Sequence, residues 1–319
     1  MKLELQALQV RPNLLSHLAL VVLLLLFTVG VTVLYVSSQH AFLGGDINDG
    51  FCQRAIEVTD LFRQSPWQAI QDVFQAANAT YNKFYILPLI PFLLLLGNSY
   101  LAYVISVAIV YLLPLNLMMG VLATQLIPAN PRAVFMAAVF ISTLIAPNWV
   151  TVLMGHPDIG ATLMVTIALW VCLQPFPKNQ FNKNQLNNNQ LNNNQNHQSA
   201  NWLLPYRWQV PVLGILLAVA ILFRRHFAYA DLALIGAMVG HTAIEFSRTV
   251  RQETKAAWTS LFGFAVRLGL VLATCLATLA IIAPQFTQAA LSTDFVSLYD
   301  SWSRTVPEAV GFYSTLYGW

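Results

Sequence analysis

Long apolar runs that carry almost no charge constrain this sequence more than any other feature. The first run covers residues 14–36, which is long enough to cross the roughly 30 Å hydrocarbon core of a bilayer as one helix. Of the 319 residues, 57% are apolar and 9% are charged, whereas about a quarter of an ordinary soluble domain is charged. The composition excludes a soluble globular enzyme, a disordered chain and a nucleic-acid-binding protein.

The apolar runs predict an all-α fold, a polytopic membrane helix bundle with about seven transmembrane helices. The expected spans are residues 14–36, 100–124, 133–153, 159–175, 208–223, 227–246 and 258–284. The first run is too long for the apolar region of a signal peptide, and further spans follow it, so we interpret it as an uncleaved helix. Residues 1–319 are expected to form a single transmembrane domain.

One further run, FYILPLIPFLLLLG at residues 84–97, is apolar but short. As a helix it would cover about 21 Å, less than the roughly 30 Å that a span requires. It also contains Pro88 and Pro91. We therefore predict a short re-entrant or interfacial helix within the first extracytoplasmic loop, residues 37–99.

The distribution of basic residues predicts the orientation, because cytoplasmic loops are enriched in Lys and Arg. If residues 84–97 do not cross and the N-terminus is cytoplasmic, the cytoplasmic loops contain Arg132, Lys178, Lys183, Arg207, Arg248, Arg251 and Lys255. This arrangement predicts a multi-pass protein of the cell membrane. The pair Arg224-Arg225 is the exception, because it falls on the outer side.

Two segments differ from the membrane core in composition. Residues 177–202 include the Asn/Gln-rich tract NQFNKNQLNNNQLNNNQNHQ, which has little to bury and is expected to be a disordered cytoplasmic insert. Residues 285–319 are expected to form an extracytoplasmic tail. The tail has the pattern of an approach to another helix, which suggests a truncated chain.

Polar residues gather in three segments that this topology places on the outer face. They are Asp46 and Asp49 in GGDINDG, His156 and Asp158 in GHPDIG, and the run Arg224, Arg225 and His226. Their carboxylates could take a proton, and their guanidiniums could bind a phosphate. Each segment also has a structural alternative: a solvated turn, a helix cap at the start of a span, and snorkelling of the arginines to lipid headgroups.

Other polar residues lie within the predicted spans. Asp231, His241 and Glu245 share one span, and Arg267 lies in the next, where it could pair with Asp231 or Glu245. Such residues suit either a proton relay or helix packing. The cysteines are few and scattered, and no motif for ATP, nicotinamide or zinc is present. We expect no metal and no cofactor.

The order of these features resembles the GT-C superfamily of membrane glycosyltransferases, of the protein O-mannosyltransferase and lipid A aminoarabinose transferase type. The stretches that carry the resemblance are GGDINDGFCQRAIEV, YNKFYILPLIPFLLLLGNSYLAYVISV, PNWVTVLMGHPDIGATL and ILFRRHFAYADLALIGAM. Together they extend over most of residues 14–284. No single motif is highly specific, whereas the order and spacing of the set is moderately so.

The resemblance implies a function on the extracytoplasmic face. Members of the superfamily transfer a sugar from a polyprenyl-phosphate donor, and an acidic residue of the first outer loop acts as general base on the acceptor. The matching positions are Asp46 and Asp49, with Asp158 at the second acidic position. Arg224 and Arg225, with His156 and His226 nearby, would bind the donor phosphate. The expected partners are a polyprenyl-phosphate-linked sugar, the lipid bilayer and an acceptor of unknown class, and no nucleic acid.

Two alternatives remain open from the sequence. One is a transporter or flippase-like protein, for which Asp231, His241 and Arg267 could line a path, although no inverted repeat is evident. The other is an inactive, truncated paralogue of the same fold.

Overall fold

The structure is a computed structural model that describes residues 12–38, 46–78, 82–128, 130–173, 208–251 and 254–291. Every regular element in these ranges is helical, which confirms the predicted all-α class. The N-terminal half contains α1 (Pro12–Ser38), α2 (Asp46–Gln64), α3 (Pro66–Gln75), η1 (Ala76–Asn78), η2 (Phe84–Leu89), α4 (Ile90–Leu96), α5 (Tyr100–Val107), the π-helical turn η3 (Ala108–Leu112) and α6 (Leu113–Leu126). The rest contains α7 (Pro131–Leu144), α8 (Ala146–Leu153), α9 (Asp158–Leu173), α10 (Gln209–Phe223), η5 (Arg225–Phe227), α11 (Ala228–Val250), α12 (Thr254–Ile282) and α13 (Pro284–Leu291).

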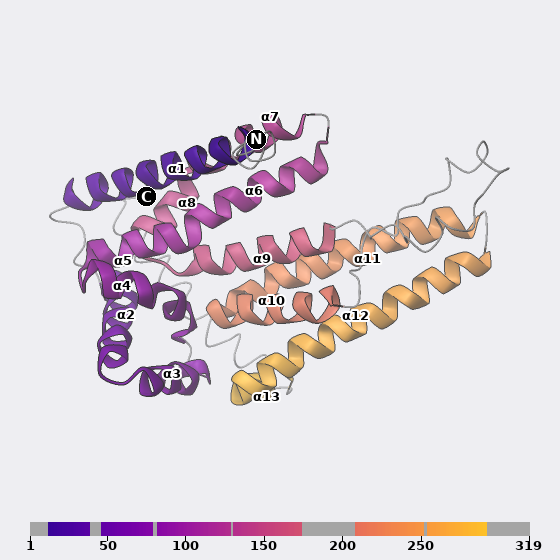
Figure 1. The fold of residues 1–319 in the computed structure, drawn as a ribbon. Coiled ribbons are helices and arrows are strands. Elements are labelled where there is room, and N and C mark those ends of the chain that lie inside the picture. The colour runs from indigo at the N-terminus through magenta and orange to yellow at the C-terminus, as the bar shows by residue number, and fades with distance from the viewer. Residues whose placement is uncertain are drawn as a thin grey trace, which may run out of the picture.

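The long helices lie side by side, while the short ones gather at one end of the bundle (Figure 1). Helices α2, α3 and α4 occupy this end, together with α13 and the turns that join α8 to α9 and α10 to α11. We call it the site end. Helix α10 packs against α9 and α12, and α6 packs against α7 and α9. The whole Asn/Gln-rich insert at 177–202 and most of the tail at 285–319 lie outside the described residues.

All seven predicted spans coincide with helices, but the helices differ in length. Four helical stretches are long and apolar enough to cross a membrane: Leu18–Ser38, Tyr100–Leu126, Arg225–Val250 and Ala257–Ile282. Helices α7 and α8 reach that length only together, and they are bent by 52°. Helices α9 and α10 are shorter apolar helices of 16 and 15 residues. Several helices of this chain could therefore span a membrane, and the count of seven stays a prediction.

The bend between α7 and α8 follows from local sequence. Ile145 adopts an extended conformation, with φ −68° and ψ 108°, and Pro147 lies in the first turn of α8. Proline lacks the backbone N–H that a continuous helix needs and clashes with the preceding turn. The predicted span at 133–153 is consequently a broken helix.

The predicted short helix at 84–97 is present as η2 followed by α4. Its inner side is part of the core, with Ile86, Leu89 and Leu93 fully buried, whereas Leu95 on its outer side is 83% exposed. The run ends at Gly97, whose φ of 92° is a backbone conformation that glycine adopts readily and other residues avoid. Its position relative to the bilayer stays a prediction.

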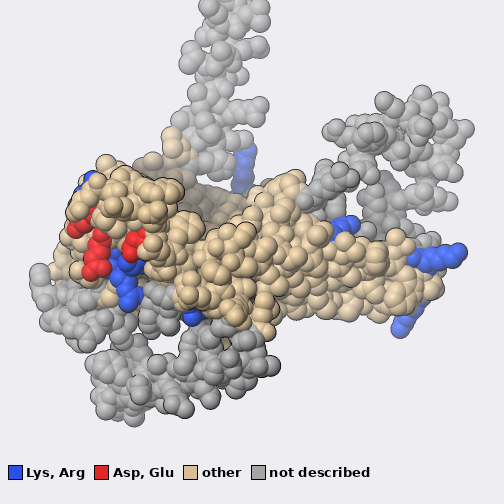
Figure 2. Space-filling model, turned by 90° about the horizontal axis from the view of Figure 1, so that it is seen from below, with Lys and Arg blue, Asp and Glu red and all other residues tan. Residues whose placement is uncertain are grey.

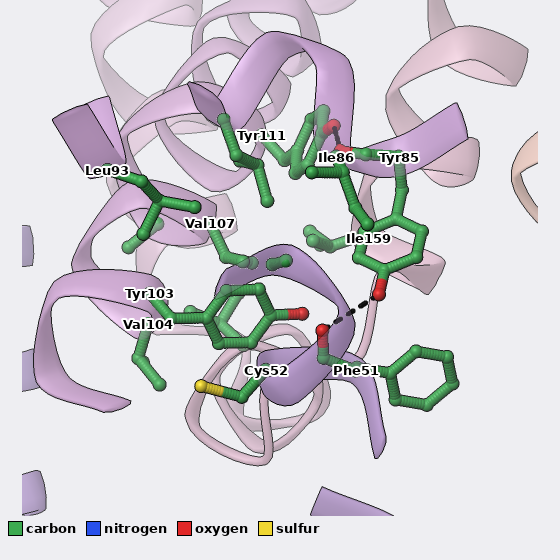
Figure 3. Packing of buried hydrophobic residues seen from close by; sticks show 14 of the residues in the cluster. Phe51, Cys52, Tyr85, Ile86, Leu93, Tyr103, Val104, Val107, Tyr111 and Ile159 are labelled. Carbon is green, nitrogen blue, oxygen red and sulfur yellow. Dashed lines mark hydrogen bonds between the residues drawn. The ribbon is translucent and has the colours of Figure 1, made fainter. Parts of the chain in front are cut away.

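Three buried tyrosines tie the elements of the site end together (Figure 3). The hydroxyl of Tyr85 donates to the carbonyl of Phe51 at 2.9 Å, that of Tyr103 to the carbonyl of Gly155 at 2.7 Å, and that of Tyr111 to the carbonyl of Tyr85. A buried tyrosine contributes a large apolar ring and needs a partner for its hydroxyl. These bonds join α2, η2 and the α8–α9 turn to the long helix formed by α5, η3 and α6.

On the face drawn in Figure 2, most charged side chains of the described residues lie toward the two ends, and the surface between them is largely uncharged. At the site end acidic and basic groups are mixed, and they include the pairs Arg63–Asp60 at 2.8 Å and Lys83–Asp72 at 2.7 Å. At the other end, the ends of α11 and α12 show basic groups on the same face. An uncharged belt between two charged ends is typical of a membrane protein.

Candidate functional site

Asp158 and Arg224, two of the predicted site residues, meet in a two-point contact. Nε of Arg224 donates to Oδ1 of Asp158 at 2.5 Å, and Nη2 approaches Oδ2 at 3.4 Å. Asp158 opens α9 and Arg224 follows the last residue of α10, so the contact joins the ends of two neighbouring helices. Both side chains are partly exposed, at 27% and 20%, so solvent and ligands can reach the pair.

Two histidines and a phenylalanine complete the group. Nε2 of His226 lies 3.6 Å from Oδ1 of Asp158. The guanidinium of Arg224 lies over the ring of Phe51, 5.0 Å from its centroid, and the ring of His156 meets Phe51 edge to face at 5.6 Å. We call Phe51, His156, Asp158, Arg224 and His226 the Asp158 cluster. It brings together α2, the α8–α9 turn and the α10–α11 turn.

The α8–α9 turn is held by two tyrosines of α5. Tyr100 donates to the carbonyl of Leu153 at 2.9 Å, and Tyr103 donates to that of Gly155. Gly155 has a φ of 69°, in the left-handed region that L side chains avoid. These two hydrogen bonds fix the turn, and the turn positions His156 and Asp158 in the cluster. Tyr100 and Tyr103 stand three residues apart in an apolar run, a spacing that indicates one polar helix face and could have signalled this role.

Arg225 belongs to a different group from its neighbour Arg224. Its Nη2 donates to the carbonyl of Asn78 at 2.6 Å, and its guanidinium lies 4.6 Å from the ring centroid of Phe286. The side-chain oxygen of Asn78 accepts the backbone N–H groups of Gln285 and Phe286, at the start of α13. Arg225 and Asn78 thus link η5 and η1 to α13, whereas the sequence suggested one phosphate site for both arginines.

Asp46 and Asp49 lie in the first turn of α2, and their side chains are outside the described part of the structure. The sequence pattern also allowed a solvated turn at this position. The backbone is instead helical from Asp46 onwards, so the two residues stand three positions apart, on the same helix face. The same helix, α2, contributes Phe51 to the Asp158 cluster.

The sequence allowed Arg267 to pair with Asp231 or Glu245, and the described contacts of these two carboxylates are different. Oε1 of Glu245 accepts from Arg248 at 2.8 Å, one turn away on the same helix. Both carboxylate oxygens of Asp231 are buried and lack a hydrogen-bond partner among the described residues. His241 is exposed.

A mostly apolar cavity of about 340 Å³ lies where the α7–α8 bend faces α1. Its walls include Phe27 and Tyr35 of α1 and Trp149 of α8. The indole N–H of Trp149 is already used, because it donates to the carbonyl of Thr143 at 2.6 Å. Leu153 and Met154, which also line the cavity, directly precede the turn that carries His156 and Asp158.

Comparison with protein-family models, with curated proteins and with solved structures found no significant match. Within the described ranges, no group of three or more His, Cys, Asp and Glu side chains is placed to hold a metal ion.

Stability is expected to fall as the pH drops below about 6.5, the ordinary pKa of histidine, because of His156. Burial lowers the pKa of His156 in the folded protein, with Asp158 opposing and Arg224 reinforcing the shift. Between the folded and the unfolded pKa the unfolded chain binds more protons, so acid favours unfolding, while above the unfolded value the effect is absent. One such group changes the unfolding free energy by at most about 1.4 kcal/mol per pH unit.

The measurement is the melting temperature in detergent between about pH 5 and 8, the range in which histidine changes its charge. His156→Gln should flatten the acid side of the profile relative to wild type. An unchanged slope in the variant would contradict the assignment to His156.

The Asp158–Arg224 pair is expected to be coupled by about 1–2 kcal/mol, because its partners are half-buried and contact each other at two points. The measurement is a double-mutant cycle with Asp158→Asn and Arg224→Gln, read from unfolding free energies. The pair Asp60–Arg63, whose side chains are 47% and 40% exposed, is the control and should show about 0.2–0.5 kcal/mol. Equal coupling in the two pairs would contradict a special role for Asp158–Arg224.

Proposed function

We propose that this protein is a membrane glycosyltransferase of the GT-C type, which moves a sugar from a polyprenyl-phosphate donor to an acceptor on the extracytoplasmic face. The observation that carries the proposal is the Asp158 cluster. It unites, at one end of the bundle, the three segments that the resemblance assigns to the catalytic side. Among the residues that the structure describes, the alternative of a transporter has no comparable group of residues in its support.

The donor phosphate is the ligand that the basic groups of the cluster suit best. A guanidinium binds phosphate through two parallel N–H groups, and the Arg224 fork is already used in this way by the Asp158 carboxylate. The carboxylate holds the guanidinium in a fixed orientation, and the phosphate is proposed to bind through N–H groups of Arg224 other than the two that face Asp158. His226, at 3.6 Å from the same carboxylate oxygen, is the second candidate donor to the phosphate.

The base is proposed to be Asp46 or Asp49 rather than Asp158, because Asp158 is engaged by Arg224. The acceptor hydroxyl oxygen attacks the anomeric carbon, and its proton passes to the carboxylate at the start of α2. The bond from the anomeric carbon to the phosphate oxygen breaks, and the polyprenyl phosphate leaves with the electron pair. Arg224 and His226 would stabilise the charge that develops on it. A single displacement of this kind inverts the anomeric carbon.

The polyprenyl chain of the donor is proposed to bind in the cavity beside the Asp158 cluster. The cavity at the α7–α8 bend is almost entirely apolar and borders the turn that carries Asp158. A polyprenyl chain in this cavity would leave its phosphate near Arg224. Leu144 and Val150 at the cavity are more than half exposed, at 57% and 51%, so the chain could enter from the bilayer.

The proposed topology has seven spans, a cytoplasmic N-terminus and an extracytoplasmic site end. Its support is the charge at the end opposite the site, where the described loop-flanking residues Arg132, Arg248, Arg251 and Lys255 are basic. Basic loops stay on the cytoplasmic side. The shorter helices α9 and α10 would span as part of the bundle, because their neighbours cover them on several sides.

The test measures donor binding and sugar transfer separately. Purified protein is given radiolabelled polyprenyl-phosphate sugars, and wild type is compared with Asp46→Asn, Asp49→Asn and Arg224→Lys. Loss of the base should lower transfer at least about 100-fold while donor binding is kept. Arg224→Lys should weaken binding instead, because lysine keeps the charge but loses the fork.

Asp72→Asn is the control, because Asp72 forms an ion pair with Lys83 at the same end but outside the cluster. It should leave both quantities unchanged. Wild type that binds a donor without turnover would support the inactive paralogue. Wild type that binds no donor would contradict the proposal.

A further inference from the structure

Asp231 is a carboxyl group enclosed by apolar side chains. It is 3% exposed, and neither of its oxygens has a hydrogen-bond partner among the described residues. It lies in the first turn of α11, within the candidate span Arg225–Val250. No part of the proposed transfer reaction uses it.

The surroundings of Asp231 follow from the helical period. Residues three, four and seven positions away share its face of α11. Those residues are Ala228, Leu234, Ile235 and Met238, and all of them belong to the apolar cluster built around α10. Asp231 therefore interrupts an otherwise apolar stripe that packs into the bundle.

The helices packed against α11 provide no counter-ion for Asp231. Those elements are α12, η5, α10 and α9. Their titratable or charged groups are Lys255, Arg267 and Cys275 on α12, Arg225 and His226 on η5, and Asp158 and Cys172 on α9, while α10 has none. Neither oxygen of Asp231 forms a hydrogen bond with any of these groups.

An ionised carboxylate without a partner in such a place would cost many kcal/mol, and buried groups of this kind become neutral instead. The positive end of a helix can favour a carboxylate. That effect is much smaller than the cost of burying the charge, and the Asp231 oxygens accept none of the free N–H groups of the first turn. The neutral acid is the form that fits the site.

We propose that Asp231 is a proton-binding site inside the membrane part of the protein, a carboxylic acid that a lipid-soluble carbodiimide can modify. In this reaction the carboxyl proton moves to one nitrogen of the carbodiimide and the carboxyl oxygen bonds to its central carbon. The adduct rearranges to a stable N-acylurea, and nothing is oxidised, reduced or released. An ionised carboxylate has no proton to supply and does not react in this way.

The first test is dicyclohexylcarbodiimide labelling of the full chain in detergent, read by peptide mass spectrometry. At neutral pH the peptide with Asp231 should gain the mass of one carbodiimide, and Asp231→Asn should lose this adduct. Glu245 on the same helix is the control, because it is paired with Arg248 in a more exposed place. It should stay unmodified by the lipid-soluble reagent.

The second test does not depend on access of the reagent. The infrared spectrum of wild type at neutral pH should contain a band of a neutral carboxylic acid that Asp231→Asn lacks. The melting temperature of Asp231→Asn should match wild type, because an amide replaces one neutral group by another. A missing acid band, or a variant that melts well below wild type, would overturn the proposal. Neither result bears on sugar transfer, so the two proposals fail separately.

Discussion

Replacing Gly214 with alanine is expected to destabilise the bundle by about 2–3 kcal/mol. An added Cβ would lie 2.6 Å from the carbonyl oxygen of Val271, 2.8 Å from Cβ of Thr274 and 3.0 Å from the backbone nitrogen of Cys275. Two of these atoms belong to the backbone of α12, which cannot move aside as a side chain does. The new methyl group would therefore push α10 and α12 apart along the contact that buries Leu213 and Leu217.

The matched control is Gly236→Ala in α11, where an added Cβ meets nothing within 4 Å. Alanine is favoured over glycine inside a helix, so this variant should be more stable than wild type by about 0.5–1 kcal/mol. The measurement is the unfolding free energy of both variants in the same detergent. Equal effects of the two substitutions would contradict the close contact between α10 and α12.

Replacing Gly155 with alanine is also expected to lower the unfolding free energy, by about 2–4 kcal/mol. The φ of 69° disfavours alanine, and an added Cβ would lie 2.8 Å from Cε1 of Tyr103. The ring of Tyr103 is fully buried and its hydroxyl is bonded to the Gly155 carbonyl. The α8–α9 turn would have to shift, and Asp158, three residues later, would shift with it.

The control for this variant is Gly50→Ala in α2, at the same end of the molecule, where an added Cβ meets nothing within 4 Å. Gly50→Ala should match or exceed the stability of wild type. Gly155→Asn separates the two causes, because asparagine tolerates the left-handed region but still has a Cβ. If Gly155→Asn is as stable as wild type, the contact with Tyr103 is not what excludes a side chain.

If the proposed function holds, Gly155→Ala should also weaken donor binding, and Gly50→Ala should not. The reason is that Asp158 orients the guanidinium of Arg224 through the two-point contact. A displaced carboxylate would leave that guanidinium without its support.

The helical class and the positions of the helices could be predicted from the sequence, because length and apolarity are properties of a continuous segment. The run at 84–97 was recognised as a separate short helix for the same reason, since its length and its prolines are local. Asp158 at the start of a helix was also predictable, because a carboxylate suits that position. The bend at Pro147 was not anticipated, although its signal, a proline inside an apolar run, is present in the sequence.

The site was predictable only in part. The sequence predicts Asp158 and Arg224 on the same membrane face, but their direct contact depends on how α9 and α10 pack. The separation of Arg224 from Arg225 could not be predicted from a sequence in which they are adjacent. It arises because the chain reverses direction at this point, so that consecutive side chains point to different neighbours.

The sequence by itself determined that this chain forms apolar helices, because an apolar segment in a membrane must satisfy its own backbone hydrogen bonds. It also determined which few segments carry charge. Only the tertiary structure decided which charges meet. Arg224 is paired with Asp158, whereas Asp231 has no hydrogen-bond partner among the described residues. The reason is that partners are supplied by helices that are distant in the sequence and close only after packing.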